Sequence, residues 1–163
     1  MEQGLLITIR KIKAICDYQF GPLITDVLFD NDNNIHIEFS KNTGRMRHIY
    51  YKENLLLNFR PTNGFFTLSL FSAKKIIKNV PKPKLRVIVK NEISDFIKMG
   101  RNVFCKHILD IDNNLRALDE VIVVNQKDEL LAIGKLMLPV PYLRSFKRGI
   151  GVNVRKGIDK SKI

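Results

Sequence analysis

The sequence predicts an α+β protein of two small domains, in which a helix packed on an antiparallel sheet precedes a small, nearly closed β-barrel. Apolar side chains recur at helical spacing near the N-terminus, and short β-branched and aromatic runs between turn residues fill most of the remainder. Pro81 and Pro83 interrupt this pattern, because a proline lacks a backbone donor and favours an extended predecessor. We therefore expect one domain over residues 1–82 and a second over residues 83–163.

The first domain is expected to start with a long helix. Its apolar positions follow a helical period and are Leu5, Ile9, Ile12, Ile15 and Cys16. Gly21 and Pro22 should end this helix. Strands are expected where β-branched and aromatic residues gather, at residues 27–29, 35–39, 47–51, 55–59 and 65–68. Ser72 is expected to cap a last helix that buries Ile76 and Ile77.

Short strands dominate the second domain. They are expected at residues 86–90, 103–109, 121–124, 130–136 and 150–154. A helix over residues 92–99 interrupts them, and the spacing of Ile93, Phe96 and Ile97 predicts its buried stripe. Several short strands with one crossing helix are typical of a small barrel.

The composition favours a polyanionic partner. The 163 residues carry 28 Lys and Arg against 16 Asp and Glu, a formal net charge of +12. Such a charge attracts polyanions over a long range and promotes binding through counterion release. No run reaches the roughly 18 to 20 apolar residues of a membrane span, and the first residues lack the basic region of a signal peptide. We expect a cytoplasmic protein with no membrane partner and with two reduced thiols, Cys16 and Cys105.

The segment that follows residue 99 gives the strongest local indication of function. The expected helix stops at Gly100, where a left-handed residue is needed, and backbone N–H groups beside a glycine can approach a phosphate closely. The expected strand after it presents Lys106 outward, one turn from Lys98 and Arg101. A basic cluster of this kind can neutralise phosphates without reading bases. The alternative interpretation is a helix stop that leads into a core strand.

Several segments resemble a known family. The second domain resembles a PUA domain, most closely the one at the C-terminus of archaeal tRNA-guanine transglycosylase, in Gly100-Arg-Asn-Val-Phe-Cys-Lys106-His107, Leu118-Asp-Glu-Val-Ile-Val-Val124, Leu131-Ala-Ile-Gly134-Lys and Phe146-Lys-Arg-Gly149-Ile-Gly-Val-Asn-Val-Arg155. The first domain is similar to the one that precedes PUA in that enzyme, in Asp17-Tyr-Gln-Phe-Gly21, Lys41-Asn-Thr-Gly-Arg45-Met-Arg47 and Asn63-Gly-Phe-Phe-Thr-Leu68. The resemblance spans nearly the whole chain, and no segment resembles the catalytic domain.

The resemblance implies a non-catalytic protein that binds tRNA or another structured RNA in support of RNA modification. In the family, the helix before the glycine, the glycine loop and the following strand contact RNA. Carried onto this sequence, the contacts fall on Lys98, Gly100, Arg101, Asn102, Lys106, Arg148, Gly149 and Arg155. Two alternatives stay open: a ribosome-biogenesis factor of similar layout that binds pre-ribosomal RNA, and a protein-interaction subunit of an RNA-modifying enzyme. The prolines of Leu138-Pro-Val-Pro141 depart from the family pattern.

The first domain offers a second candidate RNA face. Its basic side chains lie on or near the expected hairpins and are Arg45, Arg47, Lys52 and Arg60. Catalysis is not expected, because Cys105 and His107 supply at most two ligands or an unoriented pair. No phosphate-loop, dinucleotide or hydrolase motif occurs. We therefore expect no catalytic residue, no metal and no cofactor.

Overall fold

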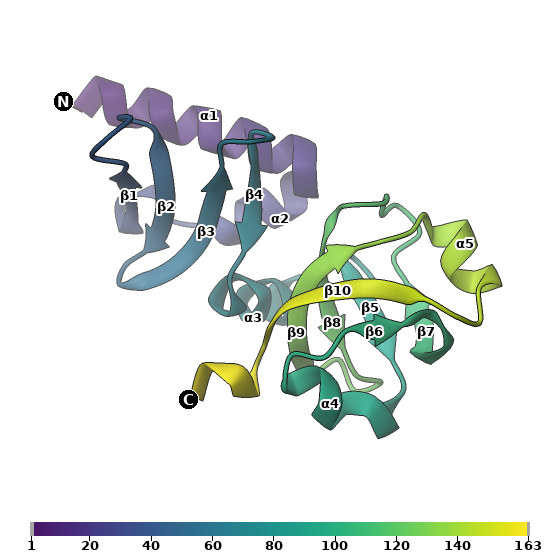
Figure 1. Ribbon diagram of the computed structural model, residues 1–163. Helices are drawn as coiled ribbons and strands as arrows, with labels where there is room; N and C mark the ends of the chain where they lie inside the picture. Colours follow the sequence, from purple (N-terminus) through teal and green to yellow (C-terminus); the bar gives the residue numbers. More distant parts are fainter. Residues whose placement is uncertain (1, 163) are drawn as a thin grey trace. The chain divides into compact units, whose positions relative to one another are not determined.

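The computed structural model describes residues 2–162 and confirms the α+β fold class (Figure 1). The chain forms two compact units, the first extending through Val80 and the second beginning at Pro81. Each unit has its own sheet, and the strands of one sheet do not pair with those of the other. Each unit is therefore built around a separate sheet.

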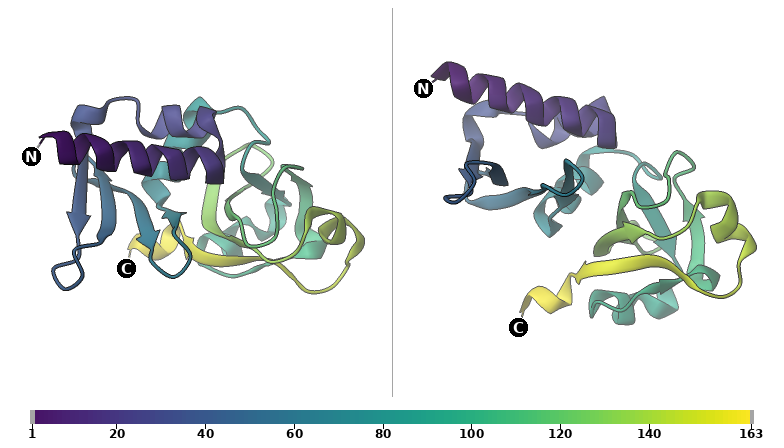
Figure 2. Two further views of the ribbon diagram at one scale, coloured as in Figure 1. Left: turned by 90° about the horizontal axis from the view of Figure 1, so that it is seen from above. Right: turned by 45° about the horizontal axis from the view of Figure 1, so that its top comes forward.

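The first unit combines three helices with a four-stranded antiparallel sheet whose spatial order follows the chain. Its elements are α1 (Glu2–Phe20), α2 (Pro22–Leu28), β1 (Ile35–Phe39), β2 (Met46–Tyr51), β3 (Asn54–Arg60), β4 (Phe65–Leu68) and α3 (Leu70–Asn79). Ile37, Ile49 and Leu57 lie opposite one another on β1, β2 and β3 and are buried. α1 and α2 lie on that side of the sheet (Figures 1 and 2).

Two expectations for the first unit were wrong. Residues 27–29 were expected to form a strand, but Val27 and Leu28 end the short helix α2. Gly21, with φ 92°, turns the chain, and Pro22 then starts a helix that buries Ile24 and Leu28 one turn apart. The β-branched residues of this segment therefore gave a misleading strand signal, because helical spacing decided which side chains are buried.

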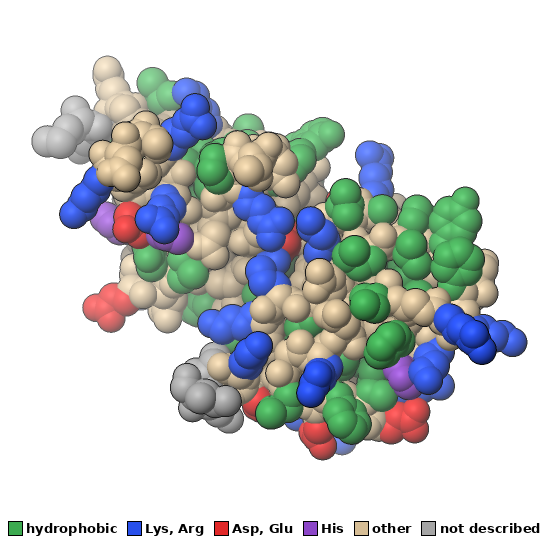
Figure 3. Space-filling view, in the orientation of Figure 1, with side chains coloured by type: hydrophobic (Ala, Val, Ile, Leu, Met, Phe, Trp, Pro, Cys, Tyr) green, Lys and Arg blue, Asp and Glu red, His purple; other side chains and the backbone are tan. Residues whose placement is uncertain are grey.

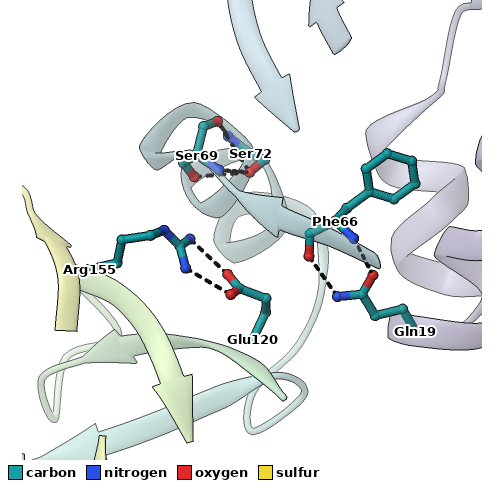
Figure 4. A network of polar contacts seen from close by, with 6 residues as sticks. All are labelled: Gln19, Phe66, Ser69, Ser72, Glu120 and Arg155. Atoms are coloured by element: carbon teal, nitrogen blue, oxygen red, sulfur yellow. Dashed lines mark hydrogen bonds and ion pairs between the residues drawn. The ribbon is translucent and has the colours of Figure 1, made fainter. Parts of the chain in front are cut away.

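The cap of α3 also differs from the expectation for Ser72. The N-cap is Ser69, whose Oγ accepts a hydrogen bond of 3.0 Å from the Ser72 backbone N–H. Ser72 Oγ in turn accepts one of 2.9 Å from the Ser69 N–H, so the two serines form a reciprocal capping box (Figure 4). Ile76 is buried as expected, whereas Ile77 is half-buried.

A side-chain amide closes the outer edge of β4. Gln19, near the end of α1, donates a hydrogen bond of 2.7 Å to the carbonyl of Phe66 and accepts one of 2.9 Å from its N–H (Figure 4). The amide thus replaces a neighbouring strand at this position. Because an unpaired edge strand invites association, this contact both anchors α1 and protects the edge.

The second unit is a curled six-stranded sheet with two short helices. Its elements are β5 (Arg86–Val89), α4 (Ser94–Lys98), β6 (Val103–Phe104), β7 (Ile108–Ile111), β8 (Glu120–Val124), β9 (Leu130–Leu136), α5 (Val140–Ser145) and β10 (Ile150–Gly157). The strand order is β6-β10-β9-β8-β5-β7, and all pairs are antiparallel except β5 with β8. The two edge strands, β6 and β7, are consecutive in the chain, so their connection nearly closes the sheet into a barrel (Figure 1).

The expected strand at residues 103–109 is therefore broken. β6 pairs with β10 and β7 pairs with β5, at opposite edges of the sheet. A 3-10 turn, Cys105–His107, carries the chain from one edge to the other. Lys106 lies in this turn rather than on a strand, and Leu109 is 48% exposed.

A buried arginine organises the start of the second unit. The Arg86 side chain is fully buried, and its Nε lies 2.7 Å from Oδ1 of Asp128. Its Nη1 donates a 2.9 Å hydrogen bond to the carbonyl of Lys84. A buried charge is tolerated only when it is paired and hydrogen-bonded, so these contacts fix the segment after Pro83 against the barrel.

Candidate nucleic-acid interface

We call Lys98 to Arg101, where α4 ends, the glycine corner. Its backbone conformation is as predicted, but its amides make hydrogen bonds within the helix end. Gly100 has φ 92°, which confirms the expected left-handed residue. Its N–H donates to the carbonyl of Ile97 at 2.9 Å, and the N–H of Arg101 donates to that of Phe96 at 3.1 Å. These two bonds form the helix end, so the amides serve the helix and not a phosphate. Side chains must therefore make any phosphate contacts at this corner.

The end of β10 holds the corner in place. A Cβ atom added to Gly157 would lie 2.1 Å from the carbonyl oxygen of Lys98 and 2.7 Å from the nitrogen of Gly100. Only a glycine permits such an approach of two backbones. Three residues earlier on β10, the Val154 N–H donates a 2.9 Å hydrogen bond to Asn102 Oδ1. Asn102, expected to contact RNA, thus supports the corner.

Arg155 is also engaged within the fold. Its two terminal nitrogens each lie 2.7 Å from a carboxylate oxygen of Glu120, in a bidentate pair (Figure 4). The Glu120 side chain is only 4% exposed. Arg155 is the extra residue of a β-bulge, because Val154 pairs with Gly134 and Lys156 with Ile133. The resemblance placed Arg155 among the RNA contacts, whereas its side chain joins β10 to β8 across β9.

The other basic residues predicted to contact RNA form two groups along one edge of the barrel. We call this edge the β6–β10 edge and define it as residues 98–106 and 148–160. One group is at the glycine corner, where Lys98 is half-buried, Arg101 is exposed, and the Lys160 side chain lies over Gly100. The other group is Lys106 and Arg148, both exposed, and the Cys105 N–H donates to the Gly149 carbonyl between them.

The two groups are separate, contrary to the expectation that Lys106 lies one turn from Lys98 and Arg101. The intervening segment of β6 is extended, which at roughly 3.3 Å per residue puts the groups on the order of 15 Å apart. Exposed Phe104 and Ile150 pair across the two strands between them. Figure 3 shows Lys and Arg side chains at both ends of β10, with hydrophobic side chains over the strands between.

Two exposed apolar side chains at α4 and its C-cap were not among the predicted RNA contacts. Phe96 was expected in the buried stripe, but it is 64% exposed, and neighbouring Met99 is 59% exposed. α4 is only five residues long and buries Ser94 and Ile97 instead. An exposed aromatic ring beside Lys98 and Arg101 can stack on a nucleobase while the cations hold the backbone.

The chemistry of the 3-10 turn does not indicate a nucleophile. Burial raises the pKa of the Cys105 thiol, so the thiol stays protonated near neutral pH. Burial, with the positive charges of Lys106 and Lys90, lowers the pKa of His107, whose Nδ1 is buried without a hydrogen-bond partner. Within residues 2–162, no group of three His, Cys, Asp or Glu side chains could hold a metal ion.

The four basic residues predicted for the first unit lie on or beside strands β2 and β3. Arg45 precedes β2, Arg47 lies on it, Lys52 is in the turn to β3, and Arg60 ends β3. The first three are exposed, and Arg60 is half-buried. The face opposite α1 and α2 carries polar and aromatic side chains and is called here the open sheet face. Its central residues are His36, Glu38, His48, Tyr50 and Asn58.

Two family models match the chain. Residues 10–83 match the patch-forming domain C2 of tRNA-guanine transglycosylase, and residues 85–158 match the PUA domain. The tRNA-guanine(15) transglycosylase of Methanobrevibacter smithii is 41% identical over 152 residues, which are 93% of this chain and 23% of the relative. That of Thermoplasma volcanium is 41% identical over 154 residues, 94% of this chain and 24% of the relative. The chain thus spans about a quarter of these relatives.

Solved structures share the fold. A hypothetical protein from Pyrococcus horikoshii superposes with a TM-score of 0.73 at 23% identity, covering 91% of this chain and 89% of the other. A conserved PUA domain protein from Thermoplasma acidophilum superposes with a TM-score of 0.57 at 17% identity, covering 76% of this chain and 75% of the other.

None of the helices in residues 2–162 has the length and apolar character needed to cross a membrane.

Proposed function

Because the chain joins a patch-forming domain C2 of the tRNA-guanine transglycosylase type to a PUA domain, we propose that it binds structured RNA through the β6–β10 edge. The observation that carries this proposal is the arrangement of the edge. Arg101 and Lys106 are exposed at its two ends, and among the described residues neither forms an ion pair. Such side chains can neutralise phosphates on a path along the edge.

The proposed RNA is tRNA, bound in support of a modification made by another catalytic region. The relatives act on tRNA according to their name, and this chain matches only their C2 and PUA domains. We assign the chain a binding role and no catalytic step. Crosslinking followed by sequencing of the bound RNA tests the choice of RNA. Recovery of tRNA supports the proposal, and recovery of pre-ribosomal RNA supports a role in ribosome assembly instead.

Binding to a folded tRNA is expected to weaken steeply with salt. Counterion release gives a slope of roughly 0.7 to 0.9 per neutralised phosphate, so four to six phosphates give a log-log slope of roughly −3 to −5. Combining Arg101→Ala with Lys106→Ala should reduce the affinity about tenfold and make the slope shallower by about 1 to 2. Titrations by fluorescence anisotropy at several salt concentrations measure both quantities.

A matched control removes the same charge elsewhere. Lys78→Ala with Lys127→Ala replaces two exposed lysines outside the β6–β10 edge. This variant should lose much less affinity than the edge variant, although its net charge is identical. Equal losses would mean that overall charge, and not the edge, binds the RNA. If the folded edge variant keeps the wild-type affinity, the edge does not bind the RNA. Gly100 would then be only a helix stop that leads into a core strand.

A second candidate function is docking to an enzyme subunit through the start of α1. Leu5, Leu6 and Ile7 are 46%, 51% and 53% exposed, and three consecutive helical positions cover more than one side of the helix. An exposed apolar cluster of this kind is typical of an interaction site. The proposed partner is a transglycosylase catalytic region, because this chain corresponds to the C-terminal region of longer relatives.

This candidate predicts that two substitutions on α1 weaken association. The probe is the Methanobrevibacter smithii transglycosylase truncated before its own C2 domain. Leu6→Lys with Ile7→Lys should weaken its binding about 100-fold or more, because about 1.5 kcal/mol or more is lost for each apolar side chain that stays in water and about 1.4 kcal/mol corresponds to a factor of ten. Gln3→Lys adds charge to the same helix without removing an apolar group and serves as the control. Calorimetry that shows no association of the wild-type chain, or equal association of both variants, would exclude this docking site.

A further inference from the structure

The open sheet face is a continuous surface created by the register of three strands. His36 lies opposite Tyr50, Glu38 lies opposite His48, and His48 lies opposite Asn58. Directly opposed residues of an antiparallel pair share a face, so all five side chains lie on the same side of the sheet. This side is the one away from α1 and α2. In Figure 3, purple histidine side chains and a red acidic side chain lie among blue basic ones over β1 and β2.

Three rings form a row on this face. The Tyr50 ring centroid lies 6.3 Å from that of His36 and 6.3 Å from that of His48, with interplanar angles of 40° and 66°. His36 is exposed, and the other two residues are half-buried. The tilted rings therefore leave part of their surfaces available to a planar group from outside.

Hydrogen bonds fix the polar ends of the rings. The Tyr50 hydroxyl donates to Glu38 Oε2 at 3.3 Å, and His48 Nδ1 is hydrogen-bonded to Asn58 Oδ1. Both contacts run between neighbouring strands and limit the rotation of the rings. A ring held in position loses little entropy when a ligand stacks on it.

The charges around the row are mostly basic, although exposed Glu53 shares a turn with Lys52. The carboxylate of Glu38 lies in the row, whereas Arg45, Arg47, Lys52 and Arg60 lie on the ends and turns of the strands around it. A carboxylate repels a phosphate but accepts hydrogen bonds from the exocyclic amino group of a base. The surrounding cations attract phosphates. This pattern fits bases over the rings and backbone at the periphery.

From these observations we propose that the open sheet face binds unpaired nucleotides of RNA by stacking their bases on His36, Tyr50 and His48. The ligand class is single-stranded RNA, as at the loops or ends of a folded RNA. This proposal rests on the proposed function, because both assume that the protein binds RNA. It assigns a second site with a different mode of recognition. The β6–β10 edge would hold phosphates of the folded part, and the open sheet face would hold bases that are not paired.

The competing explanation is that the rings only stabilise the hairpin of β1 and β2. Cross-strand aromatic pairs do this in many sheets. The two explanations differ in what a ring substitution changes. Hairpin packing affects stability alone, whereas stacking affects the affinity for single-stranded RNA and the optical signal of a stacked base.

The test uses the full chain and a short single-stranded oligoadenylate that carries one fluorescent adenine analogue. Stacking quenches the analogue, so its fluorescence reports contact with a ring and not only association. Tyr50→Leu, which keeps an apolar side chain but no ring, should reduce the affinity about tenfold and abolish most of the quenching. His36→Ala, at an exposed position, should reduce both without unfolding the unit. Tyr50→Phe retains the ring and should stay near wild type.

Tyr18→Leu is the matched control. Tyr18 is 78% exposed on α1 of the same unit, outside the open sheet face, so its loss should leave affinity and quenching unchanged. Wild-type quenching and affinity in folded His36→Ala and Tyr50→Leu variants would overturn the proposal. The salt titration with folded tRNA separates the two proposals. Loss of oligoadenylate binding with intact tRNA binding in the ring variants supports the second site. If the wild type does not bind tRNA but still shows ring-dependent quenching, the proposal for the β6–β10 edge is wrong and the proposal for the open sheet face is supported.

Discussion

Replacement of Gly157 by alanine is expected to destabilise the second unit by about 3 kcal/mol and to remove most of its RNA binding. A Cβ atom at this position would lie 2.1 Å from the Lys98 carbonyl oxygen and 2.7 Å from the Gly100 nitrogen, and both are backbone atoms. They cannot move away as the end of a flexible side chain would, so α4 and the glycine corner must shift as a whole. Such overpacking typically costs about 1–3 kcal/mol, and rigid surroundings put this case near the upper end.

Urea denaturation gives the change in the free energy of unfolding, and anisotropy with folded tRNA gives the affinity. Gly149→Ala is the control for the free energy of unfolding in the same unit. Gly149 has φ 98° but no atom within 4 Å of an added Cβ, so its replacement costs only the strained conformation, about 1 kcal/mol. If Gly157→Ala costs no more than Gly149→Ala, the close contact between β10 and the corner does not hold the site together.

Asp128→Asn is expected to cost about 3 kcal/mol, because it leaves the buried guanidinium of Arg86 without its carboxylate. Asparagine suits this position, since residue 128 has φ 61° and asparagine tolerates that conformation. The substitution therefore tests the charge and not the backbone. The loss is measured by urea denaturation at neutral pH.

The exposed neighbour provides the control, because Lys127→Ala should change the free energy of unfolding by less than about 0.5 kcal/mol. Adding Arg86→Met to Asp128→Asn removes the buried charge and should recover part of the lost stability. A cost below about 1 kcal/mol for Asp128→Asn, or a further loss in the double variant, would show that the pair contributes little.

Local sequence patterns predicted elements well where one face is buried. The strand expected at residues 35–39 is present as β1, in which Ile35 and Ile37 are buried and His36 and Glu38 are exposed. Local patterns failed where contacts with segments distant in the sequence decided the secondary structure. Val27 and Leu28 joined α2 through burial at helical spacing, and residues 103–109 were divided because their two ends pair with strands at opposite edges of the barrel.

The predicted RNA contacts also show that local patterns identify candidate residues but not their tertiary contacts. The sequence identified Arg101, Lys106 and Arg155 alike as candidates for RNA contact. Arg101 and Lys106 are exposed, whereas Arg155 binds Glu120, which lies 35 positions earlier in the chain. A pair so distant in sequence is brought together by the order of β8, β9 and β10, and no local pattern contains that order.

By itself, the sequence determined the fold class, the excess of positive charge, the left-handed glycine at position 100 and the order of motifs that resembles two known domains. These properties depend on composition, short-range periodicity and backbone preference, which neighbouring residues are sufficient to define. Only the tertiary structure decided which candidates are available to a ligand. It placed Phe96 in solvent, used Asn102 as a support and arranged His36, Tyr50 and His48 in one row. Burial and ion pairing depend on which segments pack together, and that is settled when the whole sheet forms.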